Sequence, residues 1–108
     1  MSTPMATDQP YRNACQQRLL AVQRTLFDAP IGGVTLAHVA QVTSSSKSQA
    51  LRDLSNLALA RFAEKTDDGR WRPSSAFVAL AVQAQTALAR AEARLADMRS
   101  AMDVARYT

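Results

Sequence analysis

The sequence predicts a mainly α-helical chain with one short β-hairpin and a single long helix at its end. Three observations support this: apolar residues recur at spacings of three and four, an Asp-Gly pair separates two short extended segments, and residues 74–108 contain neither glycine nor proline. With 108 residues, the chain has the size of one domain. Hydrophobic residues make up 47% and charged residues 20%, which is close to the globular average, so wholesale disorder is not expected.

The first predicted helix spans residues 11–27 and follows an arm, residues 1–10, that shows no periodicity and that we expect to be flexible. Apolar residues recur in this helix at spacings of four, three and four, so they share one face. These residues are Cys15, Leu19, Val22 and Leu26. Arg18 and Gln23 lie off that face, and the helix ends before Pro30 because proline cannot continue it.

Two further helices are predicted on either side of a turn rich in hydroxyl groups. The hydroxyl of Thr35 is expected to cap a helix of about two turns, after which residues 43–46 favour a turn over a helix interior. The third helix runs from Lys47 to about Ala60 and is amphipathic. Its polar face is rich in side chains that can read base edges: Ser48, Gln49, Arg52 and Asn56.

A β-hairpin is predicted after the third helix. Residues 61–66 and 70–72 are short alternating segments, and the Asp-Asp-Gly between them is a good signal for a tight connection. We expect Phe62 and Trp71 to form the buried side of the hairpin. The serines at 74–75 then offer a cap for the helix that follows.

The last predicted helix runs from Ala76 to about Arg106 and has the heptad pattern of a coiled coil. Spacings of four and three alternate along eight residues, called the seam below, and Ala105 continues the pattern. The seam consists of Phe77, Ala81, Ala84, Leu88, Ala91, Leu95, Met98 and Met102. The helix is about 45 Å long at 1.5 Å per residue, more than a domain of this size can cover. We therefore expect the seam to form a homodimer.

The charges beside the seam bear on the direction of this pairing. In a parallel pair, Arg94 would face Arg99 of the partner, which is unfavourable, whereas an antiparallel pair would let Glu92 approach Arg99. The sequence therefore favours antiparallel packing, or packing of the helix against the first helix of the partner.

The order of the elements is that of a winged helix-turn-helix domain, which we place at residues 11–73, ahead of the dimerisation helix at residues 74–108. Several motifs match a known family at consistent spacing. They are Gly33-Val34-Thr35-Leu36-Ala37, Lys47-Ser48, Arg52, Leu54, Leu57 and Asp68-Gly69-Arg70-Trp71-Arg72. On these motifs, the chain resembles the N-terminal DNA-binding domain of IclR-type transcriptional regulators.

Two departures from the family concern the turns. The family usually has Gly and Pro where this chain has Ser44 and Ser46, and often Gly where this chain has Arg61, which must therefore avoid or tolerate a left-handed conformation. The large effector-binding domain of the family has no counterpart here, so we expect no small-molecule effector.

The resemblance and the polar face of the third helix predict contacts with double-stranded DNA. The predicted contact residues are Ser45, Ser46, Lys47, Ser48, Gln49, Arg52, Asn56, Lys65, Arg70 and Arg72. Arg52 and Gln49 suit guanine and adenine edges, Lys47 and the serine hydroxyls beside it suit phosphates, and the cations of the hairpin suit either phosphates or the minor groove. Three alternatives remain open: Ser46 and Gln49 form a capping box, the arginines of the hairpin pair with its aspartates, and Asp53 either limits phosphate approach or is merely exposed.

Other chemistry finds little support in the sequence. One cysteine and one histidine offer neither a disulfide framework nor a metal cluster, and no nucleophile lies in plausible register with a base, so we expect no enzyme, no metal and no cofactor. No segment has the apolar length of a membrane span, and a cytoplasmic location is the default. The formal net charge of +4 is compatible with a nucleic-acid partner.

These observations predict a small homodimeric transcriptional regulator that binds double-stranded DNA sequence-specifically. Two alternatives are a winged-helix module that binds another protein, as an adaptor or an antagonist of a regulator, and an architectural DNA-binding protein without sequence preference. Acidic side chains that neutralise the basic face would favour the interaction module; the candidates are Asp53, Glu64, Asp67 and Asp68.

Overall fold

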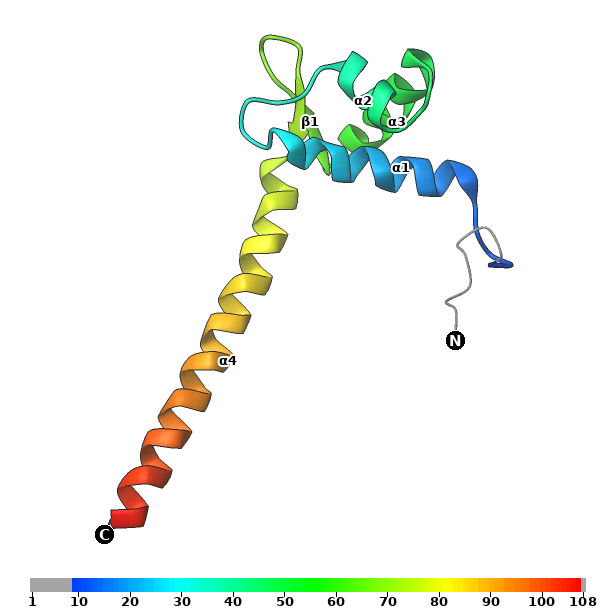
Figure 1. The fold of residues 1–108 in the computed structure, drawn as a ribbon. Helices are drawn as coiled ribbons and strands as arrows, with labels where there is room; N and C mark the ends of the chain where they lie inside the picture. The colour runs from blue at the N-terminus through cyan, green and yellow to red at the C-terminus, as the bar shows by residue number, and fades with distance from the viewer. Residues whose placement is uncertain (1–8, 108) are drawn as a thin grey trace. The chain divides into compact units, whose positions relative to one another are not determined.

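The structure is a computed structural model that describes residues 9–107. The described elements are α1 (Ala14–Thr25), a short 3₁₀ helix η2 (Leu26–Asp28), α2 (Leu36–Val42), α3 (Lys47–Leu59), β1 (Ala63–Lys65), β2 (Trp71–Pro73) and α4 (Ser75–Tyr107) (Figure 1). The predicted mainly helical fold, with a two-stranded antiparallel sheet and a long last helix, is confirmed. The predicted flexible arm lies outside the described residues, apart from residues 9 and 10.

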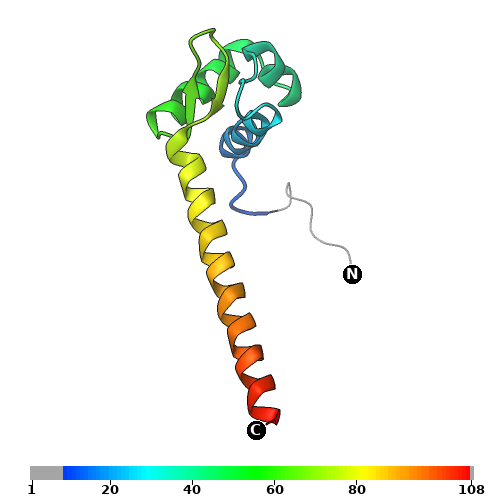
Figure 2. The same cartoon turned by 90° about the vertical axis from the view of Figure 1, so that its left-hand side faces the viewer.

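The chain divides into two compact units between Phe77 and Val78. The first unit contains every element up to the start of α4. The second unit is the remainder of α4, which Figure 2 shows as one uninterrupted helix.

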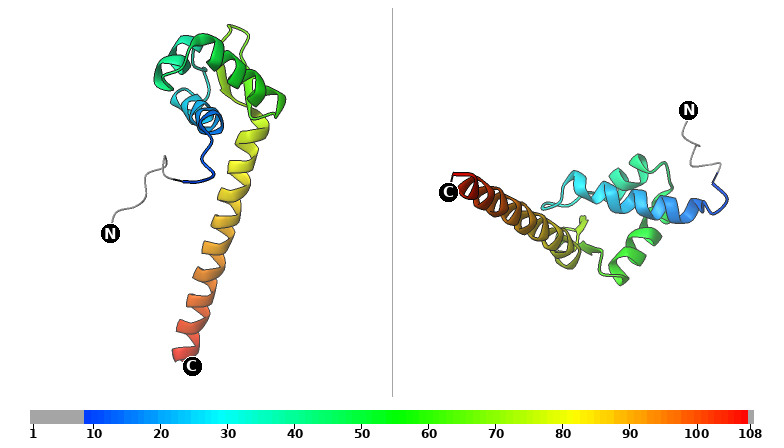
Figure 3. Two further views of the ribbon diagram at one scale, coloured as in Figure 1. Left: turned by 90° about the vertical axis from the view of Figure 1, so that its right-hand side faces the viewer. Right: turned by 90° about the horizontal axis from the view of Figure 1, so that it is seen from below.

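A single apolar core holds α1, α2, α3 and the hairpin together. The core residues are Val22, Leu26, Val34, Val39, Ala40, Ala50, Leu54, Leu57, Ala63 and Trp71. Most of them come from the predicted apolar faces of the three helices, because residues three and four apart in a helix project to the same side. Figure 3 shows α3, in green, running from the turn after α2 toward the hairpin.

The expectation for the first turn of α1 is wrong. The helix begins at Ala14, where the side chain of Asn13 accepts a hydrogen bond from the amide of Gln16 (3.0 Å), and not at residue 11. Cys15 is exposed, because the core begins only further along α1. Gln23, expected off the apolar face, is buried, and its Nε2 donates a hydrogen bond to the carbonyl of Phe62 (3.2 Å).

Helices α2 and α3 end in the same way, with a residue in the left-handed backbone region. Ser44 has φ 53° and Arg61 has φ 64°. At both ends, the amide of that residue bonds to the carbonyl three residues back and the next amide to the carbonyl five residues back, at 3.2 and 2.9 Å after α2 and 3.0 and 2.8 Å after α3. These are Schellman motifs, so Arg61 tolerates the left-handed conformation.

The hairpin pairs Ala63 with Pro73 and Lys65 with Trp71, and its turn contains Gly69 at φ 84°. Trp71 is buried as predicted, but Phe62 is 40% exposed, and Ala63 takes its expected place in the core. Phe62 lies just before β1, and because side chains of adjacent residues in a strand point to opposite sides, the side chain of Ala63 and not that of Phe62 faces the core.

The segment before α2 joins the hairpin as well. Val34 and Trp71 exchange two backbone hydrogen bonds, of 2.7 and 2.8 Å. The chain reaches this position through Gly33, which has φ 87° and lies so close to the hairpin that a Cβ atom there would be 2.8 Å from the Cβ of Arg70. The glycine is therefore needed for both its conformation and its lack of a side chain.

Candidate nucleic-acid interface

The outward face of α3 carries side chains that make no ion pair within residues 9–107. Lys47, Ser48 and Arg52 are all exposed on this face. Ser46 caps α3 two residues after the turn at Ser44, so the helix starts at Lys47 and the position of each side chain on its surface follows from that start. Two cations and a hydroxyl are thus free to meet a ligand in solution.

Asp53, the neighbour of Arg52, lies on the opposite side of α3. It is only 7% exposed, and its carboxylate accepts hydrogen bonds from Nε (2.7 Å) and Nη2 (3.3 Å) of Arg18 on α1. The hydrogen bond with Asp53 raises the pKa of Arg18 further above its ordinary value, so the arginine stays charged. Neither role expected for Asp53 is therefore right: its charge is neutralised inside the fold and does not reach the face of Arg52.

Several of the other predicted contact side chains serve the fold of α3. Ser46 and Gln49 form the capping box. The hydroxyl of Ser46 accepts a hydrogen bond from the backbone amide of Gln49 (3.0 Å), and the side-chain Oε1 of Gln49 accepts one from the backbone amide of Ser46 (3.1 Å). The hydroxyl of Ser45 bonds to that of Thr43 (2.8 Å), and Nδ2 of Asn56 donates to the carbonyl of Arg52 (2.9 Å). These groups are satisfied within the helix and its cap.

The cations of the hairpin have intramolecular partners. Arg70 forms an ion pair with Asp68 (3.6 Å), and Nζ of Lys65 lies 5.6 Å from the centre of the Trp71 ring. The pKa of Asp68 is lowered, chiefly because the hydroxyl of Thr66 donates a hydrogen bond to its carboxylate. The pairing of Arg70 follows one of the alternatives that the sequence left open.

Arg72 is the most constrained of the hairpin cations. It donates hydrogen bonds to the carbonyl of Ile31 (2.9 Å) and to the carboxylate of Glu64 across the strand pair (3.4 Å). The other oxygen of Glu64 accepts from the amide of Ser75, at the first turn of α4 (2.9 Å). The sequence singled out Glu64 as an acid that could neutralise the basic face, and its contact with Arg72 does so in part. No local pattern indicates that Glu64 also bonds to the first turn of α4.

The seam on α4 is exposed over most of its length. Leu88, Leu95, Met98 and Met102 are between 52% and 70% exposed, and no described residue of α4 is buried. Phe77 is only partly exposed, as is Ala91. The ring centre of Phe77 lies 5.8 Å from that of Phe27 and 5.1 Å from that of Phe62, and its backbone amide donates a hydrogen bond to the hydroxyl of Ser74 (3.0 Å).

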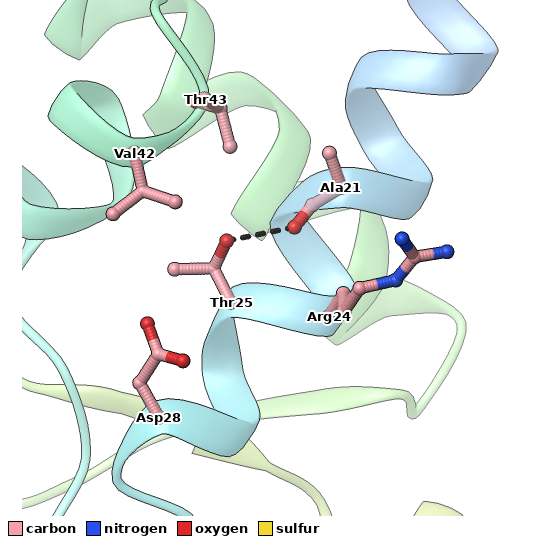
Figure 4. Close-up of a pocket in the computed structure, with 6 residues that line it drawn as sticks. All are labelled: Ala21, Arg24, Thr25, Asp28, Val42 and Thr43. Carbon is pink, nitrogen blue, oxygen red and sulfur yellow. Dashed lines mark hydrogen bonds between the residues drawn. The ribbon is translucent and has the colours of Figure 1, made fainter.

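A depression on the first unit lies apart from α3 and the hairpin. Its volume is about 240 Å³, and Figure 4 shows the residues that line it, among which the hydroxyl of Thr25 bonds to the carbonyl of Ala21 (2.8 Å) and Asp28 is the sole acid. Asp28 itself pairs with His38 (2.9 Å). No group of three or more potential metal ligands occurs among residues 9–107, and no helix in that range is both long and apolar enough to cross a membrane.

Comparison with known proteins adds no family or relative. No protein-family model matches the chain, and no curated protein matches it either. The resemblance to IclR-type regulators therefore stays a prediction from the sequence motifs.

Proposed function

We propose that this protein is a winged helix-turn-helix transcriptional regulator that binds double-stranded DNA as a homodimer, with α3 in the major groove. The observation that supports this most is the face of α3 that carries Lys47, Ser48 and Arg52 free of ion pairs, while Asp53 is held by Arg18 on the other side. A helix that exposes unpaired cations, and whose acidic side chain is paired inside the fold, is suited to bind a polyanion.

The positions along α3 suggest separate roles. Lys47 lies in the first turn, where the free amides of a helix and an ammonium group both favour a phosphate. Arg52 lies more than a turn further on, where a guanidinium can reach a guanine edge in the groove. Gln49 is the weaker candidate for base contact, because its Oε1 already serves the cap.

The hairpin supports the proposal less strongly than α3 does. Asp68 and Glu64 partly neutralise Arg70 and Arg72. Such exposed ion pairs are weak, so a phosphate can compete for the arginines. The same pairing favours the second candidate function, a winged-helix module that binds another protein.

The test is selection of bound duplexes from a random pool, followed by titration at several salt concentrations. With about three to five phosphates neutralised per protomer, the affinity should fall steeply as salt is added. Arg52→Ala should cost about 1–3 kcal/mol on the selected site and relax preference at one base position. Lys47→Ala should weaken all sequences about equally and reduce the salt slope by about one unit.

Arg24→Ala provides the matched control, because it removes the same charge from an exposed position on α1 and should change neither quantity. Lack of binding to any duplex at low salt would contradict the proposal and favour the protein-binding module. If Arg52→Ala weakens selected and unselected duplexes by the same factor, the architectural alternative is correct instead.

A further inference from the structure

We propose that α4 pairs with α4 of a second copy in one antiparallel register, in which Ala81 faces the partner's Met98 and Ala84 faces the partner's Leu95. In the same register, Leu88 faces the partner's Ala91. This inference rests on the homodimer of the proposed function and specifies its geometry. It is independent of the DNA contacts of α3.

The first argument is the distribution of side-chain size along the seam. Near its start the seam has the small residues Ala81 and Ala84, and near its end it has Leu95, Met98 and Met102. A parallel pair in register would set alanine against alanine in the two layers after Phe77 and methionine against methionine in the last two, so the two helices could not stay equally close. The antiparallel register sets a small residue against a large one in the layers of Ala81, Ala84 and Leu88, and only the outermost layer, where Met102 faces the partner's Phe77, pairs two large residues.

The second argument is charge. The part of α4 from residue 76 to residue 89 contains no charged residue, whereas all the charges of α4 lie from Arg90 onward. A parallel pair sets Arg94 against the partner's Arg99 on both sides of the seam. In the proposed register, Arg94 lies beside the partner's Ala87 instead, so no two like charges meet across the interface.

The third argument is coverage of exposed apolar surface. Val78 and Leu80 flank the seam at its start, and both are exposed. In the proposed register, they are covered by the aliphatic part of the partner's Arg99 and by the partner's Ala101. The sequence alone suggested another antiparallel register, in which Glu92 lies beside the partner's Arg99. In that register the two helices overlap mainly near their C-terminal ends, so Val78 and Leu80 would stay exposed.

The experiment measures distances between spin labels in the full-length protein. Cys15, which is exposed and forms no disulfide, is replaced by serine, and single cysteines are introduced by Thr86→Cys, Ala93→Cys or Ser100→Cys. All three positions are exposed on the face of α4 opposite the seam. In the proposed register, the labels at 86 and at 93 are each offset along the helix axis by about 10 Å from their partners, and those at 100 by about 31 Å.

Each outcome decides the proposal. Equal distances at 86 and 93 and a much longer distance at 100 support it. Equal distances at all three positions would show a parallel pair and overturn it, and a shortest distance at 93 would show another antiparallel register and overturn it. A monomer in sedimentation would overturn the pairing itself. DNA binding, measured on the same samples, tests the proposed function separately.

Discussion

At the scale of single residues, the ends of α2 and α3 place Ser44 and Arg61 in a backbone region that favours glycine. A side chain there brings Cβ close to the following carbonyl oxygen, which costs about 1–2 kcal/mol for a non-glycine residue. The Schellman hydrogen bonds that surround both residues, together with the packing of the next element, hold them in this conformation.

Arg61→Gly should therefore stabilise the protein. Glycine removes the strain at φ 64° but adds freedom to the unfolded chain, so we expect a net gain of about 0.5–1 kcal/mol in the free energy of unfolding. Denaturant titration followed by circular dichroism measures it. Arg61→Ala keeps the Cβ and is the control, which should give no such gain. A destabilised Arg61→Gly variant would mean that the side chain of Arg61 contributes more than its backbone strain costs.

At the scale of elements, the ion pair of Arg18 and Asp53 joins α1 to α3 beside the apolar core. The carboxylate is nearly buried, so it depends on the guanidinium for compensation. A buried charge that loses its partner destabilises a protein, whereas replacement of both partners by apolar residues is often neutral or stabilising.

Arg18→Met should therefore lower the denaturation midpoint clearly, because it leaves Asp53 uncompensated. The double variant Arg18→Met with Asp53→Leu should recover most of that loss. Thermal unfolding of the single and double variants measures the coupling. Arg24→Met, on an exposed position of the same helix, is the control. Equal midpoints for Arg18→Met and Arg24→Met would show that the pair does not hold α1 and α3 together.

At the scale of the whole molecule, α4 carries an apolar seam that is exposed over most of its length. A chain that ends after Gln83 keeps the whole core of the first unit but loses most of the seam. We expect this variant to be monomeric in sedimentation, to retain its near-native thermal midpoint, and to bind DNA more weakly than the full chain. A full-length chain that sediments as a monomer at micromolar concentration would contradict the homodimer.

Interactions within a few residues account for what the sequence predicted correctly. The helices follow from apolar spacings of three and four, the starts of α2 and α3 from the hydroxyls of Thr35 and Ser46, and the hairpin from its Asp-Gly turn. The polar face of α3 was recognised for the same reason, since the angular position of a residue on a helix depends only on its number.

By itself, then, the sequence determined the α-helices and the hairpin of this protein, their order and the polar face of α3. Only the tertiary structure decided the partners of Asp53 and Glu64, the burial of Gln23 and the exposure of Cys15. Arg18 lies 35 residues from Asp53, and Gln23 lies 39 residues from the carbonyl of Phe62 that it meets. Such contacts depend on how whole elements pack against one another, and packing brings together residues that no local pattern of spacing or charge relates.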